Sequence, residues 1–267
     1  MTARRDALER LAREPSGTGL FSDFDGTLAA IVSDPERAVP LPRAEEAMRQ
    51  LASLLRRVAI VSGRPASFLA RHFAGGGAVS LYGLHGLELW EDGRAEPVEA
   101  ARPYAAAVAA AVAEARAAGA GELTVEDKGL ALTLHWRQAL DPASTAAAGV
   151  GLASRLAERF GLLAKPGRSS IELVPPTGID KGSVVAREGA GLAVACFLGD
   201  DAGDLAAFEA LDRLEHEGAS VVRIAVDSAE APAELLARAD LVLDGPGAAA
   251  GFLADLVGRL SDKGAPP

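Results

Sequence analysis

Short apolar runs alternate with segments of helical periodicity over most of this chain. The elements predicted in the first part are the strand 19–23, the helix 41–56, the strand 57–61, the helix 65–73 and the strand 78–82. The elements predicted further on are the helix 181–189, the strand 193–199, the helix 204–213, the strand 220–226, the helix 231–238, the strand 240–243 and the helix 247–260. This alternation is typical of an α/β fold, a parallel sheet with helices on both faces. In such sheets ligands bind beyond the carboxyl ends of the strands.

The middle of the chain follows a different pattern. Its predicted elements are the helix 104–119, the strands 123–126 and 130–137, the helix 142–160, and the strands 162–165 and 170–174. This α-β-β order occurs twice and predicts an inserted α+β cap domain at 104–177. The catalytic core would then comprise residues 1–103 and 178–267. Prolines and glycines mark the edges of the insertion, and its two connections predict a hinge.

The sequence Asp-Phe-Asp-Gly-Thr-Leu at residues 23–28 directly follows the first predicted strand. Side chains at i and i+2 of an extended segment point the same way, so Asp23 and Asp25 would share a small volume. Gly26 permits a sharp turn there, and we expect Thr27 to cap a following helix. Asp23 could attack phosphorus and Asp25 could act as acid and base. Taken alone, the motif also fits a helix cap and a surface acid.

Two further segments predict groups that face a phosphate. Ser62 lies in Val-Ser-Gly-Arg-Pro at the end of the second strand, where a hydroxyl and free backbone N–H groups at a helix start would seat a phosphate. Lys181 would open a helix, where the helix dipole disfavours a cation, so a facing anion explains its position. The ordinary alternatives are an N-cap serine and a surface lysine.

Three acids follow the strand 193–199: Asp200, Asp201 and Asp204. Magnesium prefers hard oxygen ligands in an octahedral arrangement. Asp200 could complete a Mg²⁺ site with the acids at the end of the first strand, while Asp201 or Asp204 orients waters or the lysine. The four segments together predict magnesium-assisted phosphoryl transfer.

Composition narrows the class of protein. A formal charge of −10 argues against a general nucleic-acid binder. No apolar run approaches the ~20 residues of a membrane span, and the charged N-terminal sequence is unlike a secretory signal. The single cysteine, Cys196, lies in an apolar run where we expect a buried thiol. We therefore expect a cytoplasmic protein that binds neither nucleic acid nor a membrane. Its expected partner is a small-molecule sugar phosphate, and we expect a monomer, although composition does not give the oligomeric state.

The four motifs resemble those of the haloacid-dehalogenase-like phosphatases, and specifically the trehalose-6-phosphate phosphatase family. The resemblance covers roughly residues 18–260. It also rests on the segments Tyr82-Gly83-Leu84-His85-Gly86-Leu87-Glu88, Asp127-Lys128-Gly129, His135-Trp136-Arg137 and Ile171-Glu172-Leu173-Val174-Pro175. It implies a Rossmann-like core with an inserted cap. The implied activity is Mg²⁺-dependent hydrolysis of trehalose 6-phosphate through an aspartyl-phosphate, the final step of trehalose biosynthesis.

The resemblance also implies a role for particular residues. The implied catalytic residues are Asp23 as nucleophile, Asp25 as acid and base, and Lys181. The implied substrate-binding residues are Ser62, Gly63, Arg64, His85 and Gly86 on the core and Lys128, Arg137, Lys165 and Glu172 on the cap. The implied metal ligands are Asp23, Asp25 and Asp200, supported by Asp201 and Asp204.

Other functions remain open at this point. The catalytic motifs alone also fit a phosphatase for another sugar phosphate, such as sucrose 6-phosphate or a glycosyl-phosphoglycerate, or a phosphosugar mutase. A phospho-receiver domain uses a similar acidic cluster. A catalytically silent regulatory homologue is a further alternative, because Gly203 and Leu205 depart from the pattern of many relatives, which have a β-branched residue and an acid there.

Overall fold

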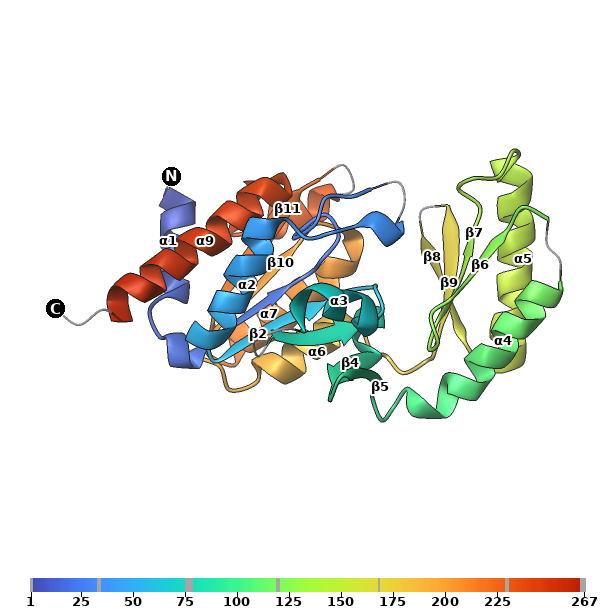
Figure 1. The fold of residues 1–267 in the computed structure, drawn as a ribbon, viewed down its shortest axis with the longest axis horizontal. Coiled ribbons are helices and arrows are strands. Elements are labelled where there is room, and N and C mark those ends of the chain that lie inside the picture. Colours follow the sequence, from blue (N-terminus) through green and yellow to red (C-terminus); the bar gives the residue numbers. More distant parts are fainter. Residues whose placement is uncertain are drawn as a thin grey trace. The chain divides into compact units, whose positions relative to one another are not determined.

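The computed structural model describes residues 2–32, 35–74, 79–118, 121–167, 169–228 and 231–264. The chain divides into two compact units, Met1–Ala95 with Ile179–Pro267, and Glu96–Gly178. Figure 1 shows the course of the chain through both. The predicted fold class, a parallel-rich α/β sheet with helices on both faces and a separate α+β cap, is confirmed.

The first unit is built around one sheet. Within the described residues its eight strands have the order β12-β11-β10-β1-β2-β3-β4-β5. These strands are β1 (Thr18–Ser22), β2 (Arg57–Val61), β3 (Val79–Gly83), β4 (Glu88–Glu91), β5 (Arg94–Pro97), β10 (Val194–Gly199), β11 (Ser220–Asp227) and β12 (Leu241–Asp244). Strands β1–β3 and β10–β12 pair in parallel, and β4 is antiparallel to β3. Because β1 lies between β2 and β10, the loops after these three strands meet at one edge of the sheet.

Helices cover both faces of this sheet. The helices on one face are α1 (Thr2–Leu11), α2 (Pro42–Leu54), α3 (Ala66–Phe73) and α9 (Gly245–Gly264). Those on the other face are α6 (Lys181–Gly189), α7 (Leu205–His216) and α8 (Ala233–Arg238). The alternation of side chains along each strand divides the core, since Leu20 of β1 packs in the first cluster and Phe21 in the second.

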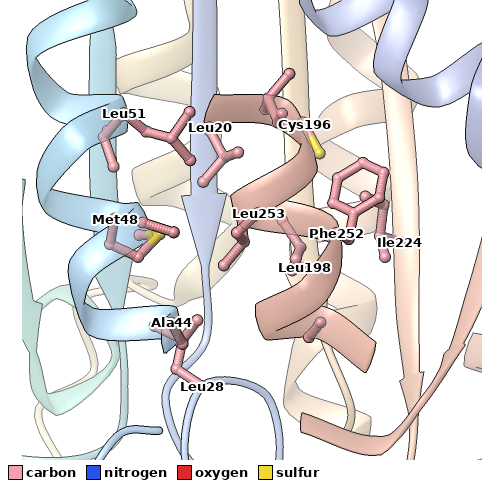
Figure 2. Packing of buried hydrophobic residues seen from close by; sticks show 14 of the residues in the cluster. Leu20, Leu28, Ala44, Met48, Leu51, Cys196, Leu198, Ile224, Phe252 and Leu253 are labelled. Carbon is pink, nitrogen blue, oxygen red and sulfur yellow. The ribbon is translucent and has the colours of Figure 1, made fainter. Parts of the chain in front are cut away.

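Helices α2 and α9 lie side by side over β1 and β10 (Figure 1). Figure 2 shows Met48 and Leu51 of α2 facing Leu20, with Leu253 of α9 on its other side. Each fully buried leucine or methionine contributes about 1.5–3 kcal/mol relative to an exposed one. Cys196 lies in the same cluster, so the expectation of a buried thiol is confirmed. Burial raises the pKa of this thiol.

The second unit contains an antiparallel sheet with two helices against one face. Its elements are α4 (Ala105–Ala117), β6 (Thr124–Asp127), β7 (Leu132–His135), α5 (Pro142–Phe160), β8 (Leu163–Gly167) and β9 (Ser170–Val174). Its strand order is β6-β7-β9-β8. Leu132, Leu134 and Leu173 point toward the helices, which leaves the alternate residues on the opposite face of the sheet.

Among the α-helices and strands that the structure describes, α1, β4 and β5 were not predicted from the sequence. Helix α1 buries only the narrow stripe Ala7, Leu8 and Leu11 in a strongly charged segment, and the two strands are short and polar. The terminal positions of two predicted elements, 78 and 119, lie outside the described residues. Among the helices that the structure describes, none combines the length and apolar composition that crossing a bilayer requires.

Candidate active site

Asp23 is held at the end of β1. Its backbone N–H donates to the Leu198 carbonyl at 2.8 Å, which extends the pairing of β1 with β10 by one residue. Its side chain is nearly buried, with 4% of the residue exposed. Burial raises the pKa of Asp23 well above its ordinary value, and the charge of Lys181 opposes this rise. The strand thus presents a carboxylate that is largely shielded from water.

The chain turns back directly after Asp25, and here one prediction is wrong. Thr27 was expected to cap a helix, but the N–H groups of Leu28 and Ala29 both donate to the Phe24 carbonyl at 2.9 Å and close a tight turn. Gly26 has a φ of +73°, which glycine adopts without strain. The Thr27 hydroxyl is therefore free to point inward instead of binding a helix N-terminus.

Asp200 lies against this turn. Its Oδ1 accepts a hydrogen bond from the Thr27 hydroxyl at 3.1 Å, and its Oδ2 accepts one from the Ser228 hydroxyl at 2.9 Å. A Cβ atom placed on Gly26 would lie 1.9 Å from Asp200 Oδ2, so the carboxylate reaches the backbone itself. Burial and the charge of Asp204 raise the pKa of Asp200 to about 7.

Lys181 begins α6 and is 2% exposed. Its ammonium nitrogen lies 2.6 Å from Asp204 Oδ1, 3.0 Å from Asp23 Oδ1 and 3.8 Å from Asp201 Oδ1. Burial alone would lower the pKa of Lys181, but the charges of Asp204 and Asp23 outweigh it and raise the pKa well above its ordinary value. Three carboxylates thus offset both burial and the unfavourable helix dipole at this position.

Asp204 anchors the acidic loop. It is fully buried, and its Oδ2 accepts the backbone N–H groups of Asp200 at 2.8 Å and Asp201 at 3.0 Å. A Cβ on Gly199 would lie 2.3 Å from Asp204 Cγ, so the strand end leaves room only for glycine. Burial raises the pKa of Asp204 to about 6, although Lys181 opposes the rise. Asp204 therefore fixes the loop and the lysine together.

Ser62 and Arg64 extend the site from the end of β2. The Ser62 side chain is buried, and its hydroxyl accepts the N–H of Arg64 at 3.2 Å. The Arg64 guanidinium donates to both carboxylate oxygens of Asp25 at 2.7 Å and lies 4.7 Å from the centre of the Phe68 ring. Arg64 thus fixes the orientation of the Asp25 carboxylate by a bidentate contact.

The loop after β3 has an unusual backbone. Leu84, His85 and Gly86 have φ angles of +51°, +59° and +107°. Two consecutive non-glycine residues in this region carry strain, which other contacts must offset. One such contact is the His85 N–H, which donates to the Ser62 carbonyl at 2.8 Å. A Cβ on Gly63 would lie 2.8 Å from the His85 ring, so this glycine lets the imidazole approach the loop after β2.

Glu88 supports the same region from β4. Its carboxylate is buried and accepts the N–H of Ala66, the first residue of α3, at 2.6 Å. Burial raises the pKa of Glu88, and the hydrogen bond from Ala66 opposes this. Helix α3 begins two residues after Arg64. The contact of Glu88 with Ala66 therefore helps to fix the start of the helix and the position of Arg64 before it.

The predicted cap residues lie in the second unit. Lys128 Nζ is 2.9 Å from Glu172 Oε1, and both side chains are mostly buried. Thr133 and Lys165 are the cross-strand neighbours of Glu172, so these groups share the face of the sheet opposite the helices. Arg137 is exposed in the turn after β7. The structure thus brings Lys128, Lys165 and Glu172 to one sheet face and leaves Arg137 in a turn beside it.

The carboxylate oxygens of Asp23, Asp201 and Asp204 lie within 4.8 Å of one another and could hold a metal ion. Lys181 already places its ammonium among these oxygens. Among the described residues this group includes neither Asp25 nor Asp200, two of the three predicted metal ligands.

Sequence reasoning missed several polar contacts of this site, among them those of Ser228 and Arg64. Ser228 was not singled out, although it follows a buried strand in the same way as the predicted acids. The bidentate contact between Arg64 and Asp25 was missed as well, because no spacing in the sequence relates side chains 39 positions apart.

Comparison with known structures identifies the fold first. A haloacid dehalogenase-like hydrolase from Bacteroides thetaiotaomicron has a TM-score of 0.61 and 16% identity, covering 90% of this chain and 99% of that one. The chain therefore has the haloacid-dehalogenase-like fold. Trehalose-6-phosphate phosphatase from Aspergillus fumigatus has a TM-score of 0.66 and 25% identity, covering 96% of this chain and 97% of the other.

The sequence comparisons then identify the family. The sequence profile described as Trehalose-phosphatase matches residues 21–240. The trehalose-phosphate phosphatase of Mycobacterium marinum is 35% identical and covers 99% of this chain and 68% of its own length. The chain belongs to the trehalose-phosphatase family, and the resemblance that the motifs carry is confirmed.

Proposed function

We propose that this protein hydrolyses trehalose 6-phosphate to trehalose and inorganic phosphate, as the final step of trehalose biosynthesis. Membership of the trehalose-phosphatase family supports the reaction and the substrate. The observation that carries the mechanism is the contact of Lys181 with Asp23 and Asp204, which joins the loops after β1 and β10 to the start of α6. A cytoplasmic monomer is part of the same proposal.

Asp23 is the proposed nucleophile. One of its carboxylate oxygens attacks phosphorus, the bond from phosphorus to the sugar oxygen breaks, and an aspartyl-phosphate forms. Lys181, fixed by Asp204, neutralises negative charge that develops beside Asp23. Ser62, with the backbone N–H groups of the loop at Gly63, binds the phosphate oxygens. Most of the rate enhancement then comes from positioning and charge neutralisation.

Asp25 is the proposed acid and base. It donates a proton to the leaving sugar oxygen in the first step, and it accepts a proton from the water that hydrolyses the aspartyl-phosphate in the second. The bidentate contact with Arg64 holds the carboxylate in one orientation in the absence of substrate. Arg64, His85 and Gly86 line the core side of the sugar site.

The residues beside Asp23 fit a magnesium ion. They offer only hard oxygen ligands, which is the donor set that Mg²⁺ prefers, and Asp200 reaches the backbone at Gly26 so closely that a methyl group there would overlap it. Asp23, Asp200 and Asp25, the last through its backbone carbonyl, would hold the ion, with Asp201 and Asp204 as supporting acids. When bound, the ion supplies charge neutralisation at the phosphate oxygens.

Cap residues provide the proposed selectivity for the sugar. Lys128, Lys165 and Glu172 present charged hydrogen-bonding groups on one sheet face, and Arg137 lies in the adjoining turn. Sugar hydroxyls are both donors and acceptors, so a paired lysine and glutamate is suited to bind them. We propose that these four residues contact the disaccharide.

The test is phosphate release from a panel of sugar phosphates, measured with Mg²⁺ and with chelator. We expect Mg²⁺-dependent turnover with a preference for trehalose 6-phosphate. Asp23→Asn should lose activity by orders of magnitude and keep its fold, whereas Asp244→Asn, an exposed acid at the end of the edge strand β12, should behave as the wild type. Undiminished turnover by Asp23→Asn would refute the nucleophile, and preference for another sugar phosphate would refute the substrate.

A further inference from the structure

Ser228 contacts the site from a strand that none of the sequence motifs includes. It directly follows β11, which pairs in parallel with β10, so its loop lies next to the loop that carries Asp200. The Ser228 hydroxyl donates to Asp200 Oδ2 at 2.9 Å. A residue 28 positions further along the chain therefore contacts one oxygen of a proposed metal ligand.

The two oxygens of Asp200 are held by different loops. Thr27, in the turn after β1, donates to Oδ1 at 3.1 Å, while Ser228 donates to Oδ2. The last side-chain torsion of an aspartate, χ2, otherwise has a broad and roughly two-fold distribution of angles. Donors on opposite oxygens fix the plane of the group, and Gly26 limits its movement toward the turn.

This arrangement leaves capacity for a cation. An ionised carboxylate has about four lone-pair positions, and the two hydroxyl donors occupy one on each oxygen. The hydroxyls of Thr27 and Ser228 donate to this carboxylate and carry no charge themselves. They orient the Asp200 carboxylate without neutralising its charge. Lys181, in contrast, contacts Asp204 with a positive charge.

We propose that Ser228 is a positioning residue for the Mg²⁺ site, acting through Asp200 from a fifth strand end. The inference rests on the proposed function, because it takes Asp200 as a ligand. Partners of ligating carboxylates typically change metal affinity by about 10–100-fold when they are removed. Ser228→Ala deletes the hydroxyl and little else.

The test is titration of Mg²⁺ by calorimetry into the full-length protein without substrate. Ser228→Ala should bind Mg²⁺ about 10–100-fold more weakly than the wild type, and Ser228→Thr, which keeps a hydroxyl, should recover most of the affinity. The matched control is Ser220→Ala, at the opposite end of the same strand, where the hydroxyl contacts Arg10. In turnover assays, the Mg²⁺ concentration for half-maximal rate should rise while kcat at saturating Mg²⁺ stays close to wild type.

The outcomes separate this inference from the proposed function. Wild-type affinity in Ser228→Ala, or an equal loss in Ser220→Ala, would overturn the role of Ser228 and leave the phosphatase proposal standing. A wild-type protein that neither binds Mg²⁺ nor requires it for phosphate release would overturn both.

Discussion

Replacing Gly26 with alanine tests how closely the turn after β1 and the acidic loop after β10 depend on each other. Gly26 has a φ of +73°, and a Cβ there would lie 1.9 Å from Asp200 Oδ2. The substitution therefore imposes two costs, one on the backbone and one on the carboxylate. Both follow from a single added methyl group.

The two costs can be separated with a control. Gly191, between α6 and β10, has a φ of +75°, but nothing lies within 4 Å of the position of its Cβ. Alanine in this left-handed conformation costs about 1–2 kcal/mol, so Gly191→Ala should lose that amount of unfolding free energy. Gly26→Ala should lose the same amount plus the cost of displacing Asp200.

The second cost follows from the hydrogen bonds of Asp200. Moving its carboxylate away from the methyl group breaks or lengthens the bonds from Thr27 and Ser228. Hydrogen bonds to charged groups contribute about 1.5–3 kcal/mol each. We therefore expect Gly26→Ala to be less stable than Gly191→Ala by about 3 kcal/mol or more, and to lose Mg²⁺ affinity and activity as well.

Urea unfolding of the wild type and both variants measures the difference, and calorimetric titration of Mg²⁺ measures the effect on the site. Equal stability of the two variants, together with wild-type Mg²⁺ binding by Gly26→Ala, would refute the close approach of the two loops. Loss of activity by Gly191→Ala but not by Gly26→Ala would also contradict it, since nothing lies within 4 Å of the Cβ position at Gly191.

Two further substitutions test buried charges. Lys181→Met leaves the buried carboxylates of Asp23 and Asp204 without a cation and should cost about 3–5 kcal/mol of unfolding free energy. Part of this loss should be recovered at low pH, where the two carboxylates become protonated. A loss below about 1 kcal/mol in urea unfolding, which is the value for an exposed ion pair, would contradict the buried cluster. Burial raises the pKa of Glu88 above its ordinary 4.5, so its contribution to stability is fully present below pH 4.5 and is lost as pH rises through the folded pKa. Glu88→Gln keeps an acceptor for Ala66 and should remove this slope from unfolding measured across a pH series; an unchanged slope would assign it to another group.

Much of the core could be predicted because its signals are local. The buried strands read as continuous apolar runs, which is typical of strands covered on both faces. The predicted bounds 57–61 and 181–189 coincide with β2 and α6. Prediction was poorer where burial was partial, as in α1 and the hairpin of β4 and β5, because a narrow buried stripe hardly changes the local pattern.

The role of Thr27 shows where local reasoning stops. A threonine after a glycine at a strand end fits a helix cap as well as it fits a turn. The choice depends on Asp200, which offers a buried acceptor 173 positions away along the chain. The same holds for Arg64 and Asp25, whose contact depends on β1 and β2 being adjacent.

The sequence by itself determined most of the strands and helices, the acids at the strand ends and the family to which the chain belongs. These follow from periodicity, turn chemistry and short motifs, in which each residue acts on near neighbours. The tertiary structure alone decided which donor faces which carboxylate: Lys181 with Asp204, Thr27 and Ser228 with Asp200. Hydrogen bonds form or fail over a few tenths of an ångström, and only the packing of distant strands fixes positions that closely.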